Sequence, residues 1–288
     1  MGLPVERIGY LLGNEEESEQ TIPALTSKTS QRLDFSISII IPAHNEEKRL
    51  LTSMQRIIEY CTSQHWDYEV VIVEDGSTDR TVNVIHDLIS KDNRIKLISN
   101  KERLGKGRAI KRGVITAEKK YVSYMDADLS ADPSELERLL LFIDEFDIVV
   151  GSRILRGELP PINRPFTRSF LSHCYSILFR AMFRTVSVYD PQCGLKLFKS
   201  PAAHILLSHT ETNGFAFDCE VLVKASRLGL TIKEVPIIWK HHYGSKVCLL
   251  HEITTMAKDL LSMWYKDKVS KTNTHKDKDV YQTQPVEW

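Results

Sequence analysis

The sequence predicts an α/β fold in which a mostly parallel central sheet carries helices on both faces. Short apolar runs alternate with segments whose apolar residues recur at helical spacing, which is the order expected of a parallel sheet. Polar motifs follow several of these runs where a strand would end, and ligands bind at that edge of such sheets. The 42% hydrophobic content is enough for a sizeable core and excludes a wholly disordered chain.

Five apolar runs are predicted to be strands. The first is stopped by Pro42, and the second ends in Glu74-Asp75-Gly76-Ser77, which is typical of buried strands bounded by turns. The predicted strands are 36–41, 68–73, 95–98, 121–125 and 147–150.

Predicted helices separate these strands. Leu50, Met54 and Ile57 recur on one face of the first helix, and Pro133 stands at the start of the last, where its missing N–H is tolerated. The predicted helices begin near residues 50, 82, 105 and 133.

One folded domain is predicted from 35 to 265. The polar segments 1–34 and 266–288 lack sustained apolar periodicity, so both are expected to be flexible. Near residue 151 the alternation gives way to two long amphipathic stretches and an irregular polar segment at 190–194. The domain is therefore expected to have two halves, about 35–150 and 151–265.

Charge and cysteine content limit the function. Lys+Arg and Asp+Glu number 38 each, and this balance argues against a general nucleic-acid binder. The 5 scattered cysteines form no C-x-x-C pair and are expected to be reduced thiols in a cytoplasmic protein. No window holds the ~18 consecutive apolar residues of a spanning helix, so the chain is not expected to cross a membrane.

Asp126 and Asp128 follow the fourth predicted strand. Two carboxylates at this spacing can hold a hard divalent cation that takes phosphate oxygens and water as further ligands. A nucleoside diphosphate leaving group needs such neutralisation when a glycosidic C–O bond breaks. An isolated D-x-D is more often a solvated turn, but the neighbouring strand-end motifs favour a functional site here.

Other polar residues after the strands could contact a nucleotide. Asp75 could accept a hydrogen bond from a base or ribose, whereas Asp79 is more simply an acid in a first helical turn. Glu46 either binds nucleotide or starts a helix, and His44 alone would be an ordinary surface residue. Lys106 opens a helix and could contact phosphate, although its segment lacks the features of a Walker loop.

Nine motifs in this order resemble the family 2 glycosyltransferases of the GT-A fold, over about residues 36–265. Within that family the chain looks most like the dolichyl- or polyprenyl-phosphate hexosyltransferases. DPQCGLK, Trp239 and the YGSK that ends at Lys246 are similar to dolichyl-phosphate β-glucosyltransferase, whereas DADLS looks like dolichol-phosphate mannose synthase. The motifs are IIIPAHNEE, VVIVEDGSTDRT, LGKGRAIKRG, MDADLS, VGSR, DPQCGLKLF, FDCEVLVKA, EVPIIW and YGSK.

The resemblance implies inverting transfer of a hexose to dolichyl or polyprenyl phosphate, with glucose from UDP-glucose favoured and mannose from GDP-mannose next. The first half would bind the nucleotide sugar, the second half the acceptor, and the catalytic set would be Asp126, Asp128 and Arg153. The implied binding residues are Pro42, His44, Glu46, Asp75 and Asp126 for the nucleotide sugar, Asp126 and Asp128 for Mg²⁺ or Mn²⁺, and Arg153, Arg164, Arg168 and Lys246 for the acceptor phosphate. Lys106, from its place at a helix start, joins the nucleotide-sugar set.

The acceptor sets the expected mechanism. A lipid phosphate is anionic at neutral pH and can attack the anomeric carbon without a strong general base, so positioning and charge stabilisation supply the catalysis. Arginine suits phosphate geometry, although Arg164 and Arg168 are about equally well explained as a solvated helix start. Asp190 and Asp218 are the candidates if a base is required, and Asp218 is more simply structural.

Two apolar stripes are candidates for contact with a membrane surface. The relatives act on a bilayer lipid, so we expect a peripheral protein on the cytoplasmic face of a membrane. The same pattern also describes ordinary core-facing helices. The stripes are Phe166, Phe170, Leu171, Cys174, Ile177, Leu178, Ala181 and Met182, and Leu249, Leu250, Ile253, Met256, Ala257, Leu260, Leu261 and Trp264.

Two other interpretations remain open at this point. One is a soluble glycosyltransferase that acts on a glycan or small molecule, for which the arginines of the second half would have little purpose. The other is a non-catalytic module that binds a nucleotide sugar, and the intact Asp126 and Asp128 argue against it.

Overall fold

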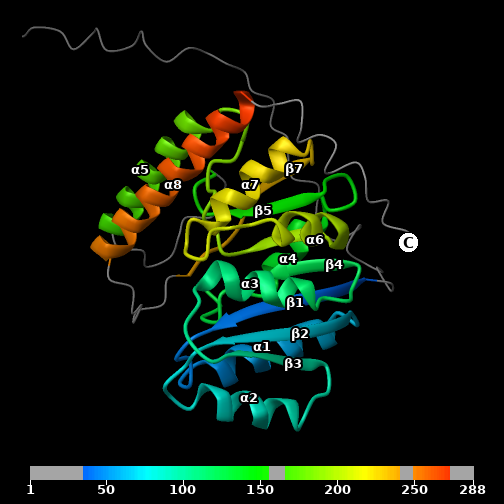
Figure 1. Cartoon of the computed structure of the whole chain (residues 1–288). Coiled ribbons are helices and arrows are strands. Elements are labelled where there is room, and N and C mark those ends of the chain that lie inside the picture. The colour runs from blue at the N-terminus through cyan, green and yellow to red at the C-terminus, as the bar shows by residue number, and fades with distance from the viewer. Residues whose placement is uncertain (1–34, 156–165, 241–248, 273–288) are drawn as a thin grey trace, which may run out of the picture. The chain divides into compact units, whose positions relative to one another are not determined.

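A seven-stranded sheet organises the chain in the computed structural model, which describes residues 35–155, 166–240 and 249–272. The strand order is β3-β2-β1-β4-β6-β5-β7 (Figure 1). β6 runs antiparallel to its neighbours β4 and β5, and the other pairings are parallel. The strands are β1 (Ser36–Ala43), β2 (Asp67–Asp75), β3 (Ile95–Asn100), β4 (Tyr121–Tyr124), β5 (Ile148–Ser152), β6 (Lys196–Lys199) and β7 (Ile232–Pro236).

Helices cover both faces of this sheet, as the sequence predicts. In β1, Ile39 and Ile41 lie in one buried cluster and Ile40 lies in the other, because successive side chains point to opposite faces. α1, α2 and α4 contribute to the first cluster, and α3, α5, α6, α7 and α8 to the second. The helices are α1 (Leu50–Ser63), α2 (Thr81–Ile89), α3 (Lys106–Ile115), α4 (Glu135–Leu140), α5 (Phe166–Met182), α6 (Ser200–Ser208), α7 (Phe217–Arg227) and α8 (Leu249–Thr272).

The five predicted strands all form, with ends within two residues of the prediction. Most of them continue further at the carboxyl end than hydropathy indicates. Asp75, for example, still pairs with Asn100 in the sheet although both residues are polar. This continued pairing carries polar side chains onto the edge where ligands are expected.

The second half differs more from its prediction. β6 and β7 complete the sheet, and α8 runs past the predicted boundary at 265 to Thr272. Asp267 is buried in this helix and forms an ion pair with Arg227 of α7. The predicted start of the tail at 266 therefore lies inside a packed helix, while the predicted extension 1–34 lies outside the described residues.

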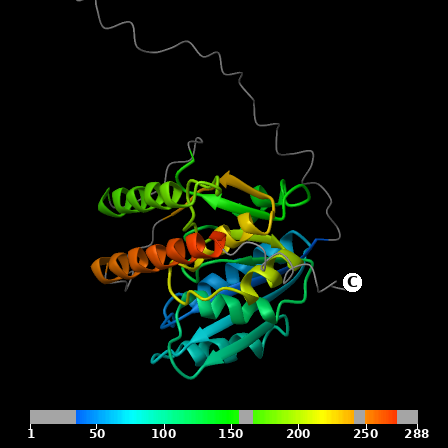
Figure 2. The same ribbon diagram turned by 45° about the horizontal axis from the view of Figure 1, so that its top comes forward.

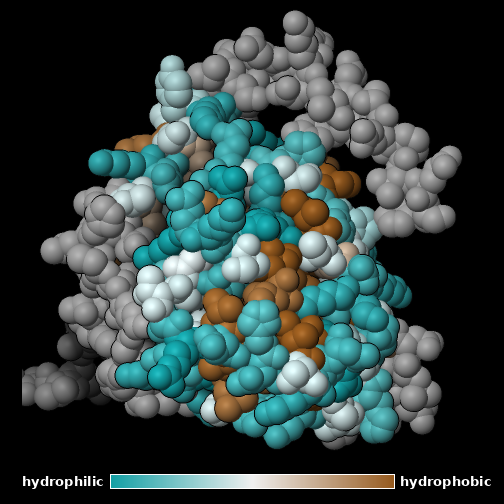
Figure 3. Space-filling view, turned by 60° about the horizontal axis from the view of Figure 1, so that its bottom comes forward, coloured by the Kyte–Doolittle hydropathy of each residue, from teal (hydrophilic) through white to brown (hydrophobic). Residues whose placement is uncertain are grey.

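The face seen in Figure 3 and the described cysteines are ordinary for a globular protein. The face turned into view in Figure 3 is mainly hydrophilic, with a group of hydrophobic side chains near its middle, as is ordinary for a globular protein. Cys61, Cys193 and Cys219 are buried, Cys174 is exposed, and all four are free. Within the described ranges, no helix is both long enough and apolar enough to span a bilayer.

Candidate active site

Polar residues converge at the carboxyl edge of the parallel strands. The chain moves outward from β1 to β2 and β3, then returns to place β4 on the other side of β1. Ligand crevices form at such reversals of strand order. Asp126 and Asp128 follow β4 directly, so the sheet places the carboxylate pair at this point.

Lys106 is the closest cation to the carboxylate pair that the structure describes. It is the first residue of α3, and its Nζ lies 2.7 Å from Asp126 Oδ1. Burial raises the pKa of Asp126, and the Lys106 charge opposes that rise only in part. On the other side, a Cβ built on Gly194 would lie 2.2 Å from Asp126 Oδ2, so a larger residue there would displace the carboxylate. Asp126 is therefore confined between a lysine and a glycine loop.

A tight turn fixes the second carboxylate. Leu129 N donates to the Asp126 carbonyl at 3.0 Å, and Ser130 N donates to Asp128 Oδ1 at 2.9 Å. Leu129 itself adopts a φ of 48°, which is uncommon for a branched side chain and indicates a constrained turn. No cluster of three or more His, Cys, Asp or Glu side chains suited to a metal occurs in the part of the chain that the structure describes. The pair therefore offers two protein ligands.

Asp75 has a structural function that the sequence did not reveal. Its Oδ1 accepts hydrogen bonds from Asn100 Nδ2 at 2.8 Å and Leu104 N at 2.9 Å, and its Oδ2 accepts from Gly105 N at 2.8 Å. Gly105, with a φ of 100°, precedes Lys106. Asp75 thus holds the loop that aims α3 at the site, and its contact with a nucleotide stays a prediction.

The residues after β1 lie at the same edge. His44 Nδ1 donates to the Asp75 carbonyl at 2.8 Å, and half-buried Pro42 lies within β1. Glu46 binds the guanidinium of Arg49, with 2.9 Å between Arg49 Nη2 and Glu46 Oε1. The pKa of Arg49 is raised chiefly by this contact and also by the charges of the D-x-D pair. The contact of Arg49 with Glu46 near the D-x-D pair was not predicted, because an arginine at the start of a helix is usually solvated.

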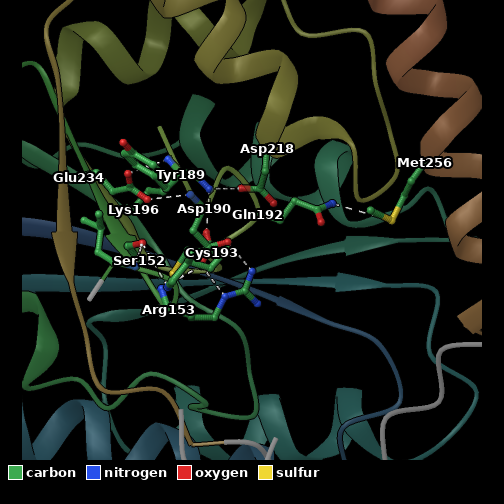
Figure 4. A network of polar contacts seen from close by, with 12 residues as sticks. Ser152, Arg153, Tyr189, Asp190, Gln192, Cys193, Lys196, Asp218, Glu234 and Met256 are labelled. Carbon is green, nitrogen blue, oxygen red and sulfur yellow. Dashed lines mark hydrogen bonds and ion pairs between the residues drawn. The ribbon is translucent and has the colours of Figure 1, made fainter. Parts of the chain in front are cut away.

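Arg153 is already engaged by a carboxylate. Its Nε and Nη2 donate to Asp190 at 2.7 Å each, and its backbone N donates to Asp190 Oδ2 at 2.9 Å (Figure 4). Burial lowers the pKa of Arg153, but Asp190 outweighs that effect and the net direction is upward. The guanidinium carbon also lies 5.1 Å from the centre of the Trp239 ring. An acceptor phosphate would have to share this guanidinium with Asp190.

The segment that carries Asp190 is held from a second side. The backbone N–H groups of Tyr189 and Asp190 both donate to Glu234 of β7 at 2.7 Å. Asp190 is buried beneath Arg153. A buried carboxylate held by an arginine is poorly placed to take a proton from a substrate, so the structure argues against Asp190 as a general base.

Asp218 is equally unsuited to that role. It is 2% exposed, and its Oδ1 accepts from Lys196 Nζ at 2.5 Å and from Tyr124 Oη at 2.7 Å. Burial raises the pKa of Asp218, but Lys196 and Lys106 outweigh it, so the pKa is lowered. Lys196 is 0% exposed and was missed. Its signal was a lysine inside the apolar run Leu-Lys-Leu-Phe, where only a paired charge is tolerated.

Three predicted acceptor residues are not placed by the structure. Arg164 and Lys246 lie outside the described residues. Arg168 belongs to α5, but its side chain lies outside the described set. Their roles stay predictions.

Sequence comparisons identify relatives over most of the chain. The model described as Glycosyl transferase family 2 matches residues 38–202. A dolichyl-phosphate beta-glucosyltransferase of Trichomonas vaginalis is 34% identical over 89% of this chain and 80% of its own length. The dolichyl-phosphate beta-glucosyltransferase of Saccharomyces cerevisiae is 28% identical over 89% of this chain and 82% of its own. Glycosyltransferase AglD of Haloferax volcanii is 31% identical over 80% of this chain, which spans only 37% of AglD.

Solved structures share the fold. Glucosyl-3-phosphoglycerate synthase of Mycobacterium tuberculosis in complex with Mn²⁺, UDP and glucosyl-3-phosphoglycerate has a TM-score of 0.62 and 20% identity over 80% of each chain. The same enzyme with UDP alone gives a TM-score of 0.61 at 22% identity, also over 80% of each chain. At this identity the likeness confirms the predicted GT-A architecture.

Proposed function

The chain belongs to glycosyl transferase family 2 and is a glycosyltransferase, and we propose that it transfers glucose from UDP-glucose to dolichyl or polyprenyl phosphate with inversion at the anomeric carbon. The observation that carries this proposal is the 34% identity to a dolichyl-phosphate beta-glucosyltransferase of which the chain covers 80%. Mannose from GDP-mannose is the next choice of donor, because DADLS looks like the mannose synthase motif.

Mg²⁺ or Mn²⁺ is the cofactor that we propose for Asp126 and Asp128. The fit rests on the donor set, since carboxylates are the ligands that hard cations prefer and such cations keep sites for water and phosphate. The burial that raises the pKa of Asp126 also favours a cation beside it. When bound, the cation would neutralise the charge that develops on the departing nucleoside diphosphate.

Lys106 and the start of α3 are proposed to bind that diphosphate. The ammonium lies beside Asp126. The Gly107 N–H of the first turn already donates to the Asn213 carbonyl at 2.8 Å, so the ammonium is the main proposed contact. His44, Glu46 and Asp75 at the neighbouring strand ends are proposed to face the base and ribose. These residues would hold the donor so that its anomeric carbon faces the second half of the site.

Arg153 is proposed to bind the acceptor phosphate, together with Arg164 or Arg168 and with Lys246. Asp190 would orient the Arg153 fork, leaving further guanidinium donors for the phosphate. The nucleophile is then an oxygen of an anionic phosphate, which needs no deprotonation. The ion pairs of Asp190 and Asp218 support this base-free route.

A lipid surface is the proposed surrounding of the acceptor site. Ile177 and Leu178 of α5 are 65% and 42% exposed, and Leu261 of α8 is 57% exposed. α5 and α8 run alongside each other in both views (Figures 1 and 2), and both pack on the same core cluster. Part of each predicted stripe thus faces outward, whereas Leu260 of the α8 stripe faces the core, as does Phe179, which is not a member of the α5 stripe. We propose that the outward part contacts the cytoplasmic leaflet that carries the acceptor.

A donor and acceptor panel tests the reaction. The protein is incubated with UDP-glucose or GDP-mannose, with dolichyl phosphate or dolichol, and with Mg²⁺, Mn²⁺ or EDTA. We expect a glucosylated lipid from UDP-glucose and dolichyl phosphate only, with loss of product in EDTA and a β-linkage in the product. Product from uncharged dolichol, or from a soluble glycan in place of the lipid, would contradict the proposed acceptor.

Sedimentation with anionic vesicles tests the lipid contact. Ile177→Asp and Leu178→Asp are expected to release the protein from vesicles, because each puts a charge into the apolar contact. Ile115→Asp is the matched control, since Ile115 is 58% exposed on α3. Equal vesicle binding by the wild type and both α5 variants would contradict the assignment.

A further inference from the structure

Lys106 lies between two carboxylates that belong to different halves of the site. Its Nζ is 2.7 Å from Asp126 Oδ1 after β4 and 4.0 Å from Asp218 Oδ2 in the first turn of α7. Only 15% of the Lys106 side chain is exposed. The nearer contact is a hydrogen-bonded ion pair, and the farther one is an ion pair without a hydrogen bond.

Asp218 is not free to move with the Lys106 side chain, because its second carboxylate oxygen, Oδ1, is held by hydrogen bonds. Lys196 Nζ at 2.5 Å and Tyr124 Oη at 2.7 Å both donate to Asp218 Oδ1. Lys196 Nζ also donates to the Cys193 carbonyl at 2.7 Å, which ties Asp218 to the loop that ends at Gly194. Asp218 therefore presents a stationary second carboxylate toward Lys106.

The nearer contact conflicts with the proposed cofactor. A divalent cation at Asp126 would share that carboxylate with the Lys106 ammonium, and two cations so close repel each other strongly where solvent is largely excluded. Lysine is a long side chain with rotatable bonds, so it can move toward Asp218 while Asp126 stays in its turn. Gly194 lies against the other carboxylate oxygen of Asp126.

We propose that Lys106 is a resident cation of the D-x-D pair: it pairs with Asp126 until a divalent cation binds, then gives up that carboxylate and is held between Asp218 and the nucleoside diphosphate. Asp218 is a positioning residue in this account, and Lys196 and Tyr124 hold it in place. The inference rests on the proposed function. It explains why a lysine, a second carboxylate and a fully buried lysine form one continuous chain of charges beside the D-x-D pair.

The exchange has a thermodynamic consequence. A cation that arrives alone must displace Lys106 from Asp126, whereas a cation that arrives with a diphosphate gives the displaced ammonium a new anion. Binding of Mn²⁺ and UDP should therefore be coupled, each raising the affinity of the enzyme for the other.

Replacement of Lys106 tests this coupling, because the expected change in Mn²⁺ affinity has opposite signs without and with UDP. The full-length Lys106→Met protein is titrated with Mn²⁺, and free Mn²⁺ is measured by electron paramagnetic resonance with and without UDP. Without UDP we expect Lys106→Met to bind Mn²⁺ about tenfold more tightly than the wild type, and with UDP more weakly than the wild type. Lys106→Arg keeps the charge and is expected to keep weak binding of Mn²⁺ alone.

Lys111→Met is the matched control for the loss of one positive charge. Lys111 lies on the same helix, and its Nζ donates to the Thr210 carbonyl rather than to the site. If Lys106→Met binds Mn²⁺ alone no more tightly than Lys111→Met, the resident-cation proposal is overturned. The proposed function would survive that result if Mn²⁺·UDP binding is lost in Asp126→Asn and the glucosylated lipid is still formed by the wild type. Absence of that lipid would instead overturn the proposed function.

Discussion

The two halves of the site hold their charges in different ways. Beyond β1, β2 and β4, the polar side chains follow parallel strands, and Asp126 keeps 30% of its side chain exposed. Around β5, β6 and α7, the charges are buried and paired with one another, Arg153 with Asp190 and Lys196 with Asp218. The first arrangement leaves carboxylates available to a ligand, and the second fixes loops. Loss of a charge should therefore affect mainly activity in the first half and, at the Lys196–Asp218 pair, mainly stability in the second.

The largest effect is expected from Lys196→Met. It leaves Asp218 buried without its closest cation, so the free energy of unfolding should fall by about 3–5 kcal/mol. Urea unfolding followed by tryptophan fluorescence measures the change. Lys196→Met combined with Asp218→Asn removes both charges and should recover most of the loss. Equal stability of Lys196→Met and the half-buried control Lys111→Met would contradict this difference between the two halves of the site.

Asp126→Asn should show the reverse pattern. Glucosyl transfer is expected to fall by about 10²–10³-fold, because charge stabilisation of the leaving group is lost. The free energy of unfolding should fall by about 1.5 kcal/mol, less than in Lys196→Met, since Lys106 loses its nearest carboxylate but still has Asp218 at 4.0 Å. Turnover and urea unfolding are compared with those of Asp87→Asn, an exposed aspartate of α2. Unfolding of Asp126→Asn under native conditions would contradict the comparison.

Arg153→Lys tests whether Arg153 binds the acceptor rather than the donor. Lysine keeps the charge but loses the fork, so the acceptor KM should rise about tenfold, the value of one hydrogen bond to a charged group. The donor KM should stay close to that of the wild type. Arg227→Lys, which alters the Arg227–Asp267 pair away from the site, is the control. A parallel rise in both KM values would show that Arg153 only supports the fold.

The smallest effect is expected on the pH dependence of the free energy of unfolding in acid. The pKa of Asp218 is lowered in the folded protein, because Lys196 and Lys106 outweigh its burial. Its contribution to stability is therefore complete above the unfolded pKa of about 3.9 and is lost as the pH falls through the lower folded value. Unfolding free energies measured from pH 5 downward should fall less steeply in Lys196→Met/Asp218→Asn than in the wild type. An identical slope would show that Asp218 does not contribute.

The same contrast explains what the sequence could predict. β1 to β5 and their helices follow local apolar periodicity, and their polar ends, Asp75 and Asp126 among them, stand beside turns that are visible in the sequence. Lys196 stands out as a lysine in an apolar run, but the partner of Lys196 and of Tyr124 could not be predicted, because Asp218 is distant in the sequence. The engagement of Arg153 by Asp190 was hidden for the same reason. Buried charges that pair with residues distant in the sequence produce no periodic pattern from which the pair could be predicted.

Motif order, by contrast, predicted the family correctly. The order of the short motifs along the chain indicated the family, and the family model over residues 38–202 and a relative that is 34% identical confirm it. The acceptor residues Arg164, Arg168 and Lys246 rested on the resemblance alone, and the described structure does not test them.

The antiparallel strand β6 has a mechanical consequence. It is hydrogen-bonded to β4 on one side and to β5 on the other, so the strand that precedes the carboxylate pair and the strand that precedes Arg153 are joined through a single neighbour. The two halves of the site therefore cannot move apart as rigid bodies without breaking the hydrogen bonds that β6 makes with β4 or β5. We expect the distance between sugar donor and lipid phosphate to be set at folding, and access to be governed by the loops and helices that rim the sheet.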